Sequence, residues 1–334
     1  MAISLLPAAF GGGARAGDDE MLISCGDALI DFVPTTTADG RQALLPMVGG
    51  SCLNVAIGFA RLGGPAGFVG GISTDMFGQM IAEQATASGV ELRFATRNDR
   101  QTTLAFARIV SDESYYAFYD SDTAAHHWTY RRGTIPLEAV EAVHVGSTTL
   151  VHEKCAHETL ALIAVAREFG SHASATISLD PNCRPNLVKD KRAYLARMAE
   201  FVASADIIRI SAADFTYLYG NVPYQQKADA MLADGASLVI ITRGIDGAVA
   251  WHQNAGQIEI PASRVKVVDT IGAGDSFQAA LLFALREQGR LARKQLASIS
   301  AGELRRALSF AAYCSGVTCT RPGADPPWGH QIES

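Results

Sequence analysis

The sequence of 334 residues has no apolar run long enough to cross a membrane and no cluster of five or more lysine and arginine residues. A membrane-spanning helix needs about 20 consecutive apolar residues. Acidic residues outnumber basic ones by 34 to 28, which gives a formal net charge of −6. Without a basic stretch, the chain has little electrostatic attraction for nucleic acid or for an anionic membrane, so we expect neither as a partner.

Pairs of cysteines with the spacing C-x-x-C are also missing among the six cysteines. In a chain of this length, the absence of such a pair indicates reduced and mostly buried thiols. Neither Cys52 nor Cys183 has a base beside it in the sequence, so we interpret both as packing residues rather than nucleophiles. Reduced thiols favour a cytoplasmic location.

The first ten residues are apolar, but they lack the basic segment that begins a secretory signal, and three glycines follow them. We therefore expect no signal peptide. The strand-like stretch 21–25 is predicted to begin the folded domain. Residues 1–20 are then expected to form a flexible extension, with a wrongly assigned start site as the alternative, and residues 21–330 are expected to form a single domain.

Strand-like and helical stretches alternate over most of the chain, which is typical of an α/β fold. Such alternation predicts a mostly parallel central sheet with right-handed crossovers and helices on both faces. Ligands of such sheets bind at the carboxyl ends of the strands. The predicted strands are 21–33, 67–72, 143–146, 176–180, 207–211 and 238–242, with a late hairpin at 247–251 and 257–260. The predicted helices include 77–88 and 305–319.

Two strand-like stretches, 102–110 and 114–120, follow one another without a helix between them and predict a β-hairpin. With the strand-like residues near 32–48, we interpret the segment 95–125 as a small β lid over the ligand site. A hairpin at the sheet edge with no part in ligand binding is the alternative.

Apolar residues alternate along both strands of the lid. A ligand can cover only one face of this small sheet, so its second face needs another cover. Phe106 and Phe118 are expected on this outward face. We therefore predict a homodimer in which the lids of two subunits meet across a two-fold axis. In the alternative, the protein's own core covers this face.

A glycine-rich loop, G-A-G-D at residues 272–275, lies between a β-rich run at 257–268 and a helical run from about 277. Its glycines allow close approach of the backbone, and the N–H groups of a helix N-terminus favour an anion there. Because the charge of Asp275 opposes a bound anion, we interpret this residue as a general base beside a phosphate. An aspartate that only begins a helix is the alternative.

Three further stretches place polar groups at predicted strand ends. Asp27 and Asp31 form a carboxylate pair suited to sugar hydroxyls, or else are turn residues. The Gly49-Gly50 step enters a helix that carries Asn54, and Ser51 as its N-cap is the alternative. In the string D-P-N-C-R at 180–184, two flanking prolines stiffen a loop that offers an amide and a phosphate-binding arginine, although a surface connector fits as well.

Two of these strings together resemble the paired signatures of the ribokinase-like carbohydrate kinases, also called the phosphofructokinase B family. The N-terminal signature matches G-G-S-C-L-N at 49–54 with R-L-G at 61–63, and the C-terminal one matches D-T-I-G-A-G-D at 269–275. The resemblance covers about residues 21–327. It implies a ribokinase-like kinase domain with a β lid, ATP and Mg²⁺ as cofactors, and phosphoryl transfer to a monosaccharide.

The resemblance also implies roles for individual residues, with the Asp275 carboxylate as the base. The backbone amides around the transferred phosphoryl group are those of Gly272, Ala273, Gly274 and Asp275. The residues expected to bind the sugar are Asp31, Gly49, Gly50, Asn54, Arg108, Tyr119 and Arg184. The residues expected to bind ATP are Asn182, Asp214, Thr242, Gly244, Gly247 and Ala312.

Where the family has an Asn-x-x-Glu motif, this chain has Ser211 and Asp214, so a water is expected to bridge to the magnesium ion. A helix cap is the alternative role for this pair. The resemblance further implies a K⁺ site, but Pro327 stands where ribokinase offers a hydroxyl ligand. The implied cation ligands are Asp269, Ile271, Thr318, Arg321 and Gly323.

The string at 180–184 is shared by the fructokinase and 2-keto-3-deoxygluconate kinase branches of the family. Fructose is the expected substrate. A 2-keto-3-deoxygluconate kinase is the alternative, with Arg108 pairing with the substrate carboxylate. A catalytically inactive sugar-binding relative would lack the base or the anion-binding loop, and both are present. A nicotinamide oxidoreductase would need G-x-G-x-x-G after the first strand, which is missing.

Overall fold

The computed structural model describes residues 20–110, 113–171 and 174–332. Its main element is a nine-stranded sheet with the order β15-β14-β13-β12-β11-β10-β1-β4-β6. Neighbouring strands are parallel, except that β13, β14 and β15 pair antiparallel. The strands are β1 (Met21–Cys25), β4 (Ala66–Val69), β6 (Val90–Glu91), β10 (Val140–Gly146), β11 (Thr176–Asp180), β12 (Ile207–Ser211), β13 (Leu238–Thr242), β14 (Ala248–His252) and β15 (Gly256–Ile260).

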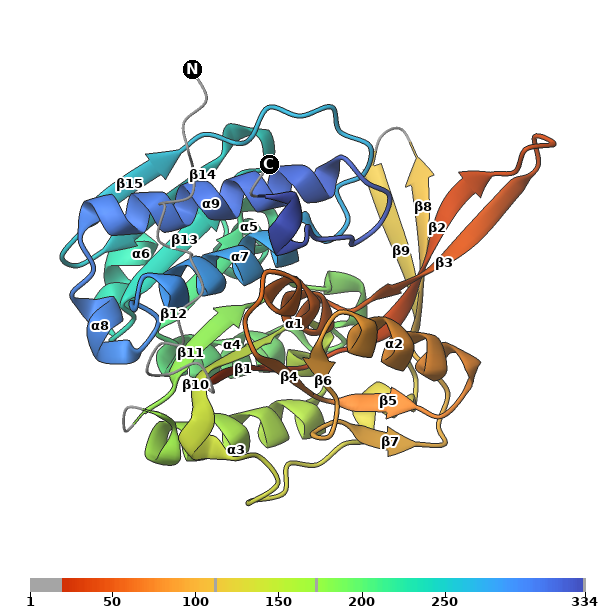
Figure 1. The fold of residues 1–334 in the computed structure, drawn as a ribbon, viewed down its shortest axis with the longest axis horizontal. Helices are drawn as coiled ribbons and strands as arrows, with labels where there is room; N and C mark the ends of the chain where they lie inside the picture. The colour runs from red at the N-terminus through yellow and green to blue at the C-terminus, as the bar shows by residue number, and fades with distance from the viewer. Residues whose placement is uncertain (1–19, 111–112, 172–173, 333–334) are drawn as a thin grey trace.

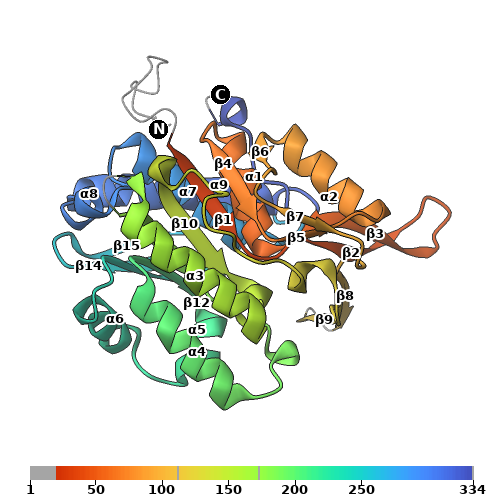
Figure 2. The same cartoon turned by 90° about the horizontal axis from the view of Figure 1, so that it is seen from below.

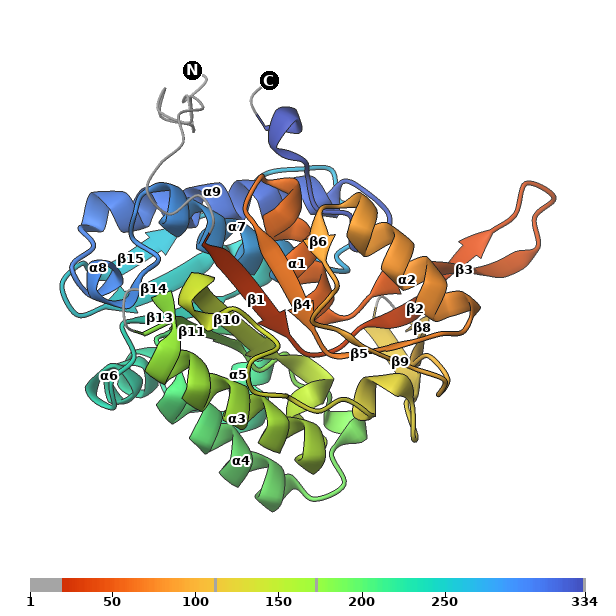
Figure 3. The same cartoon turned by 60° about the horizontal axis from the view of Figure 1, so that its bottom comes forward.

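Helices cover both faces of this sheet, as Figures 1 and 3 show. Below it lie α3 (Glu153–Phe169), α4 (Lys191–Ser204), α5 (Ala212–Tyr219) and α6 (Tyr224–Ala233). The other face carries α1 (Ser51–Arg61), α7 (Ala273–Glu287) and α9 (Ala301–Cys319), with α8 (Arg293–Ala297) beside them and α2 (Met76–Ala87) next to the lid.

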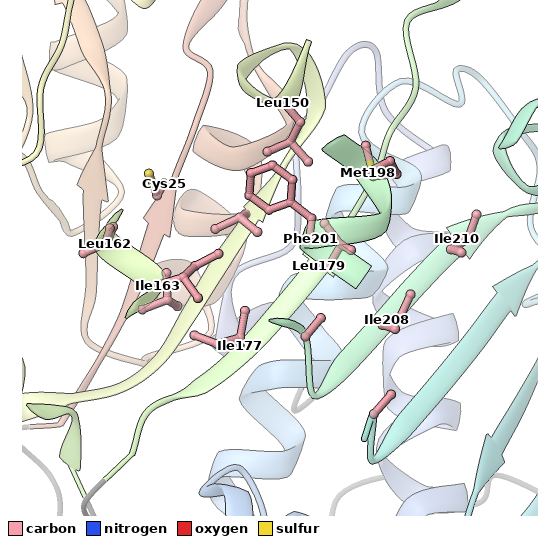
Figure 4. Packing of buried hydrophobic residues seen from close by; sticks show 14 of the residues in the cluster. Cys25, Leu150, Leu162, Ile163, Ile177, Leu179, Met198, Phe201, Ile208 and Ile210 are labelled. Atoms are coloured by element: carbon pink, nitrogen blue, oxygen red, sulfur yellow. The ribbon is translucent and has the colours of Figure 1, made fainter. Parts of the chain in front are cut away.

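Two large apolar cores lie on opposite faces of the sheet, and a third, smaller one lies between α1, α2 and the base of the lid. In the first, buried side chains of β1, β11 and β12 pack against α3 and α4, as Figure 4 shows for Ile177, Leu162 and Phe201. The strands are apolar on both faces because both are covered. The parallel α/β sheet predicted from the sequence is therefore confirmed. The strands predicted at 176–180, 207–211 and 238–242 have the predicted bounds.

A four-stranded sheet with the order β3-β2-β8-β9 forms the lid. It projects from the domain in Figures 1 and 2. Its strands are β2 (Leu29–Thr36), β3 (Gln42–Gly49), β8 (Leu104–Val110) and β9 (Glu113–Tyr119). The predicted hairpin and the strand material near 32–48 thus belong to one sheet. A separate pair, β5 (Gly71–Ser73) and β7 (Thr96–Asn98), lies near its base.

The prediction of one strand over residues 21–33 was wrong. The chain leaves the central sheet after β1 and enters the lid as β2, which continues through Pro34. At the crossing, the N–H of Gly26 donates to the Val69 carbonyl, and the Asp27 carboxylate accepts from the N–H of Cys52. These contacts come from distant segments, so alternation along the local sequence could not reveal the break.

The β-rich run predicted over 257–268 is also shorter than expected. Strand β15 ends at Ile260, and the residues from Pro261 to the glycine-rich loop form no strand. Proline has no N–H for a ladder, and Val267 and Val268 are exposed. The expected extension at 1–20 lies outside the described residues, except for Glu20. Over the described part of the chain, no helix is both long and apolar enough to span a membrane.

Candidate active site

A polar cleft of about 220 Å³ lies where the lid meets the carboxyl ends of the central strands. Its volume is small beside the roughly 300–1,000 Å³ of sites for drug-sized ligands, so it suits a small polar molecule. The cleft brings together segments from the whole chain. It is lined by Asp27, Leu29, Asp31, Gly50, Ser51, Asn54, Phe118, Asn182, Arg184, Thr270, Ile271, Gly272, Gly274 and Asp275.

Asp275 lies in the first turn of α7 and is 6% exposed. Its Oδ1 accepts hydrogen bonds from Ser51 Oγ at 2.7 Å and from Asn182 Nδ2 at 3.3 Å. Its Oδ2 accepts from Asn54 Nδ2 at 2.8 Å. Three side chains from two distant segments therefore hold the carboxylate in one orientation.

Burial raises the pKa of Asp275 to about 6, and the hydrogen bonds from Asn54 and Ser51 limit this rise. A carboxyl group with such a pKa is ionised at neutral pH yet is more basic than an exposed aspartate. It is thus suited to accept a proton from a hydroxyl group. Sequence reasoning did not assign a contact to Ser51, which follows Gly50 directly.

The glycine-rich loop forms the N-terminus of α7, with Gly272 as its N-cap at φ 72°. A Cβ at Gly274 would lie 2.7 Å from Arg209 Nη1, so a larger residue there would displace the guanidinium group. The N–H of Ala273 donates to the Thr270 carbonyl at 3.2 Å. The N–H groups of Gly274 and Asp275 are in the first turn, where an α-helix has no i−4 carbonyl to offer them.

Arg209 is a buried charge that the sequence analysis missed. Its Nη1 pairs with Asp180 Oδ2 at 2.6 Å, and its Nη2 donates to Thr242 Oγ1 at 2.5 Å. The guanidinium group thereby connects the ends of β11, β12 and β13 beneath the glycine-rich loop. A signal was present, because this arginine stands within the apolar strand Ile207–Ser211.

The Gly49-Gly50 step shapes the sugar side of the cleft. A Cβ at Gly49 would overlap the Asp31 carboxylate, and Gly50 adopts φ 103°, which favours glycine. Gly50, not Ser51, is the N-cap residue of α1. The alternative in which Ser51 caps the helix is therefore wrong, since its hydroxyl group donates to Asp275 instead.

Burial raises the pKa of Asp31 to about 7, while the charge of Arg184 opposes this rise. Arg184 lines the same cleft, and its Nη1 donates to the carbonyls of Asn182 and Cys183, both at 3.1 Å. Asn182 adopts φ 40°, a conformation that asparagine tolerates better than most residues. The stiff loop after β11 therefore directs both a cation and an amide into the cleft.

The pair Ser211 and Asp214 begins α5. Ser211 Oγ accepts from the N–H of Asp214, and the Asp214 carboxylate accepts from Ser211 Oγ and from the N–H of Cys183. This is the helix cap that the sequence left open as an alternative. Burial and the charge of Asp180 raise the pKa of Asp214.

The lid residue that faces the cleft is Phe118 rather than Tyr119. In the lid, Asp31 pairs with Ala105 and Ala105 pairs with Phe118, so these three residues share one face. Tyr119 is on the opposite face and is 65% exposed. The expectation that Tyr119 contacts the sugar does not fit this register.

The opposite lid face carries Phe106, which stacks on Phe32 with ring centroids 4.6 Å apart. Phe77 of α2 meets the edge of Phe32, so the domain itself covers part of this face. The expectation that Phe106 and Phe118 share one outward face was wrong. Phe118 pairs with Ala105, the neighbour of Phe106, so the two rings lie on opposite faces of the lid. The side chain of Arg108 lies outside the described part of the chain.

The residues expected to bind the nucleotide lie at the end of β13, in the turn after it and in α9. Thr242 ends β13, and Gly244 and Gly247 bracket a short 3₁₀ turn with φ 59° and 77°. Ala312 lies in α9, where its carbonyl accepts from Ser263 Oγ at 3.1 Å. None of these four is among the residues that line the described cleft.

The implied cation ligands come from the loop before α7 and from the end of α9 with the residues after it. Asp269 Oδ1 accepts from the N–H of Ile271 at 3.0 Å, and its Oδ2 accepts from the N–H of Gly323 at 2.8 Å. The Thr318 carbonyl accepts from the N–H of Arg321. Each of these oxygens keeps a second lone pair.

Known proteins resemble this chain over nearly its full length. A bacterial fructokinase from Rhizobium leguminosarum bv. trifolii is 37% identical over 285 residues, which are 85% of this chain and 86% of the relative. A Xylella fastidiosa fructokinase with bound ATP superimposes with a TM-score of 0.83 at 25% identity, covering 93% and 96% of the two chains. A Vibrio cholerae O395 fructokinase with fructose, ADP and calcium gives 0.78 at 26%, covering 92% and 95%.

The central sheet, the lid and the site at the strand ends define a ribokinase-like sugar kinase. The profile described as pfkB family carbohydrate kinase matches residues 19–330. The chain belongs to this pfkB family.

Proposed function

We propose that this protein transfers the γ-phosphoryl group of ATP to a primary hydroxyl group of fructose. The observation that carries the proposal is the buried Asp275 carboxylate, held by three side chains beside a glycine-rich helix N-terminus in a small polar cleft. The fructokinase relatives support fructose as the acceptor.

In the proposed reaction, the sugar hydroxyl group gives its proton to Asp275 while its oxygen forms a bond to the γ-phosphorus. The bond from this phosphorus to the bridging oxygen breaks, and ADP leaves. The N–H groups of Gly274 and Asp275, with the end of the α7 dipole, stabilise the charge on the phosphoryl oxygens. Gly272 and Ala273 set the turn that aims these groups.

The proposed nucleotide contacts come from Thr242, Gly244, Gly247 and Ala312, with Asn182 nearer the transferred group. Magnesium bound with ATP neutralises phosphate charge. We propose that Asp214 holds the magnesium ion through a water molecule. Direct contact is not expected, because the Asp214 side chain is already engaged in the α5 cap. The proposed monovalent cation would occupy the oxygens around Asp269.

Asp31 and Arg184 are the groups proposed to select the sugar. The Asp31 carboxylate accepts hydrogen bonds from sugar hydroxyls, and the space for it depends on Gly49. Asn54 donates a hydrogen bond to Asp275, so we propose that it orients the base as well as contacting the sugar.

A second candidate substrate is an acidic sugar such as 2-keto-3-deoxygluconate. The observation that favours it is the guanidinium group of Arg184 in the cleft, close enough to Asp31 to oppose the rise in its pKa. A carboxylate on the sugar would pair with this cation.

ADP release with ATP, Mg²⁺ and a panel of sugars tests the proposal. We expect kcat/KM to be highest for fructose. A higher value for 2-keto-3-deoxygluconate would assign the second substrate, and release with no sugar in the panel would contradict both. A panel that includes a nucleoside is useful, because related folds also phosphorylate a riboside.

The lid makes a testable contribution to sugar binding. Phe118→Ala should raise KM for the sugar roughly 10-fold, because an apolar wall of the cleft is lost. Tyr119→Ala, at the next position on the other face, should change KM less than about twofold. Steady-state kinetics measure both. A larger effect of Tyr119→Ala would show that its face contacts the sugar.

We also propose a homodimer through the outer lid face, which contains Phe32, Leu44, Phe106 and Tyr119. Leu44 and Tyr119 are 45% and 65% exposed, although α2 covers part of the same face. A second subunit would remove these apolar groups from water.

The free cysteines are in keeping with the proposed cytoplasmic location.

Adjacent leucines on β3 provide a matched test of the dimer. Leu44 pairs with Pro34 on the outer face, whereas Leu45 pairs with Val33 on the inner face, and the two are 45% and 48% exposed. Light scattering at micromolar concentration should report a dimer for the wild type and Leu45→Glu, but a monomer for Leu44→Glu. A monomeric wild type would contradict the proposed dimer.

A further inference from the structure

A group of three side chains at the root of the lid has no part in the proposed reaction. It contains Asp120, His126 and His152, whose ligand atoms all lie within 4.8 Å of one another. Asp120 follows the lid strand β9, His126 ends a short 3₁₀ turn at Ala124–His126, and His152 precedes α3 of the main domain. Among the described residues, this is the one group of three or more histidine, cysteine or acidic side chains close enough together to hold a metal ion.

The distances within the group match those around a tetrahedral metal ion. His152 Nε2 lies 3.0 Å and His126 Nε2 lies 3.6 Å from Asp120 Oδ2. Zinc–ligand bonds of about 2.0–2.1 Å at tetrahedral angles place neighbouring ligand atoms about 3.3 Å apart. Small side-chain movements would therefore bring all three atoms into coordination.

The two imidazole rings approach one another closely, with centroids 3.6 Å apart. Two imidazolium ions would repel at this distance, whereas neutral imidazoles offer the lone pairs that metals bind. Both Nε2 atoms lie near Asp120 Oδ2, so a single ion can reach all three ligand atoms.

The backbone around the group is fixed before any ion binds. Cys155 Sγ of α3 lies 3.7 Å from the Ala125 carbonyl, which holds the 3₁₀ turn against the helix. His152 is the N-cap residue of α3, but its side chain makes no capping hydrogen bond and is directed to Asp120. The side chains of Asp120, His126 and His152 are 14%, 15% and 29% exposed, which shields them and still allows entry of an ion.

We propose that Asp120, His126 and His152 bind a Zn²⁺ ion that connects the root of the lid to α3. Two imidazoles and one carboxylate favour zinc over magnesium, which prefers oxygen ligands. A water molecule completes the tetrahedron. The ion stabilises the attachment of the lid and takes no part in phosphoryl transfer.

Zinc titration of untagged protein, stripped of metal by a chelator and free of nucleotide, tests this site. We expect one Zn²⁺ per chain. His126→Ala and His152→Ala should each weaken binding by at least the roughly 10- to 100-fold that loss of an outer-shell partner costs. Co²⁺ in place of zinc should give the intense visible absorption of a tetrahedral site.

His127→Ala is the matched control, because His127 follows His126 directly and pairs with Asp122 instead. It should bind zinc like the wild type. Zinc should raise the melting temperature of the wild type and of His127→Ala, but not of His152→Ala. The near-isosteric Asp120→Asn, which preserves the shape of the side chain, should also weaken binding, with an unchanged circular dichroism spectrum.

Three outcomes would overturn the proposal. One is less than about one zinc ion for every five chains. Another is equal weakening by His127→Ala, and the third is unchanged affinity in both His126→Ala and His152→Ala.

Discussion

Asp275→Asn should lower kcat by about two to four orders of magnitude, the usual contribution of a general base. The amide keeps the shape of the side chain but cannot take the hydroxyl proton. Sugar and nucleotide affinity, measured by calorimetry, should change little, because Asp275 is not a principal binding contact in the proposed reaction. A variant with more than about a tenth of the wild-type rate would show that Asp275 is not the base.

The pH dependence provides an independent measurement on the same group. The pKa of Asp275 is raised to about 6, so the carboxyl group is protonated below that pH and cannot accept a proton. The wild-type kcat/KM should therefore rise as the pH increases through about 6, because kcat/KM reports the pKa of the base in the free enzyme. Asp234→Asn, at an exposed position after α6, is the control and should keep both the rate and the profile.

Arg209→Met should lower the free energy of unfolding by about 3–5 kcal/mol. The substitution removes one partner of the ion pair with Asp180, which is 1% exposed, and leaves a buried carboxylate without its cation. Urea unfolding followed by circular dichroism measures the loss. Because Arg209 also packs against Gly274, we expect the nucleotide KM to rise in the same variant.

Two further variants separate the buried charge from the loss of packing. In Arg209→Met combined with Asp180→Asn, no unpaired charge remains, so part of the lost stability should return. Arg93→Met removes an exposed pair with Glu91 at 3.6 Å and should cost less than about 1 kcal/mol. A loss in Arg209→Met as small as that in Arg93→Met would contradict the importance of the buried pair.

The central sheet was predictable because its signal is local. Apolar runs such as 176–180 and 238–242 alternate with helical periodicity, and this alternation indicates a parallel sheet wherever it occurs. The glycine-rich loop was predictable for a similar reason, since glycines before a helical run specify a turn whatever surrounds it. The break after Cys25 was not, because residues far away in the chain impose it.

The sequence by itself therefore determined the α/β class, the lid hairpin, and the loop that carries Asp275. Only the tertiary structure decided that Ser51, Asn54 and Asn182 converge on that carboxylate, because they come from segments more than 90 residues away from it. It also decided that Phe118 rather than Tyr119 faces the cleft. In a sheet with period-two alternation, pairing between strands sets the face, and a shift of one residue reverses it.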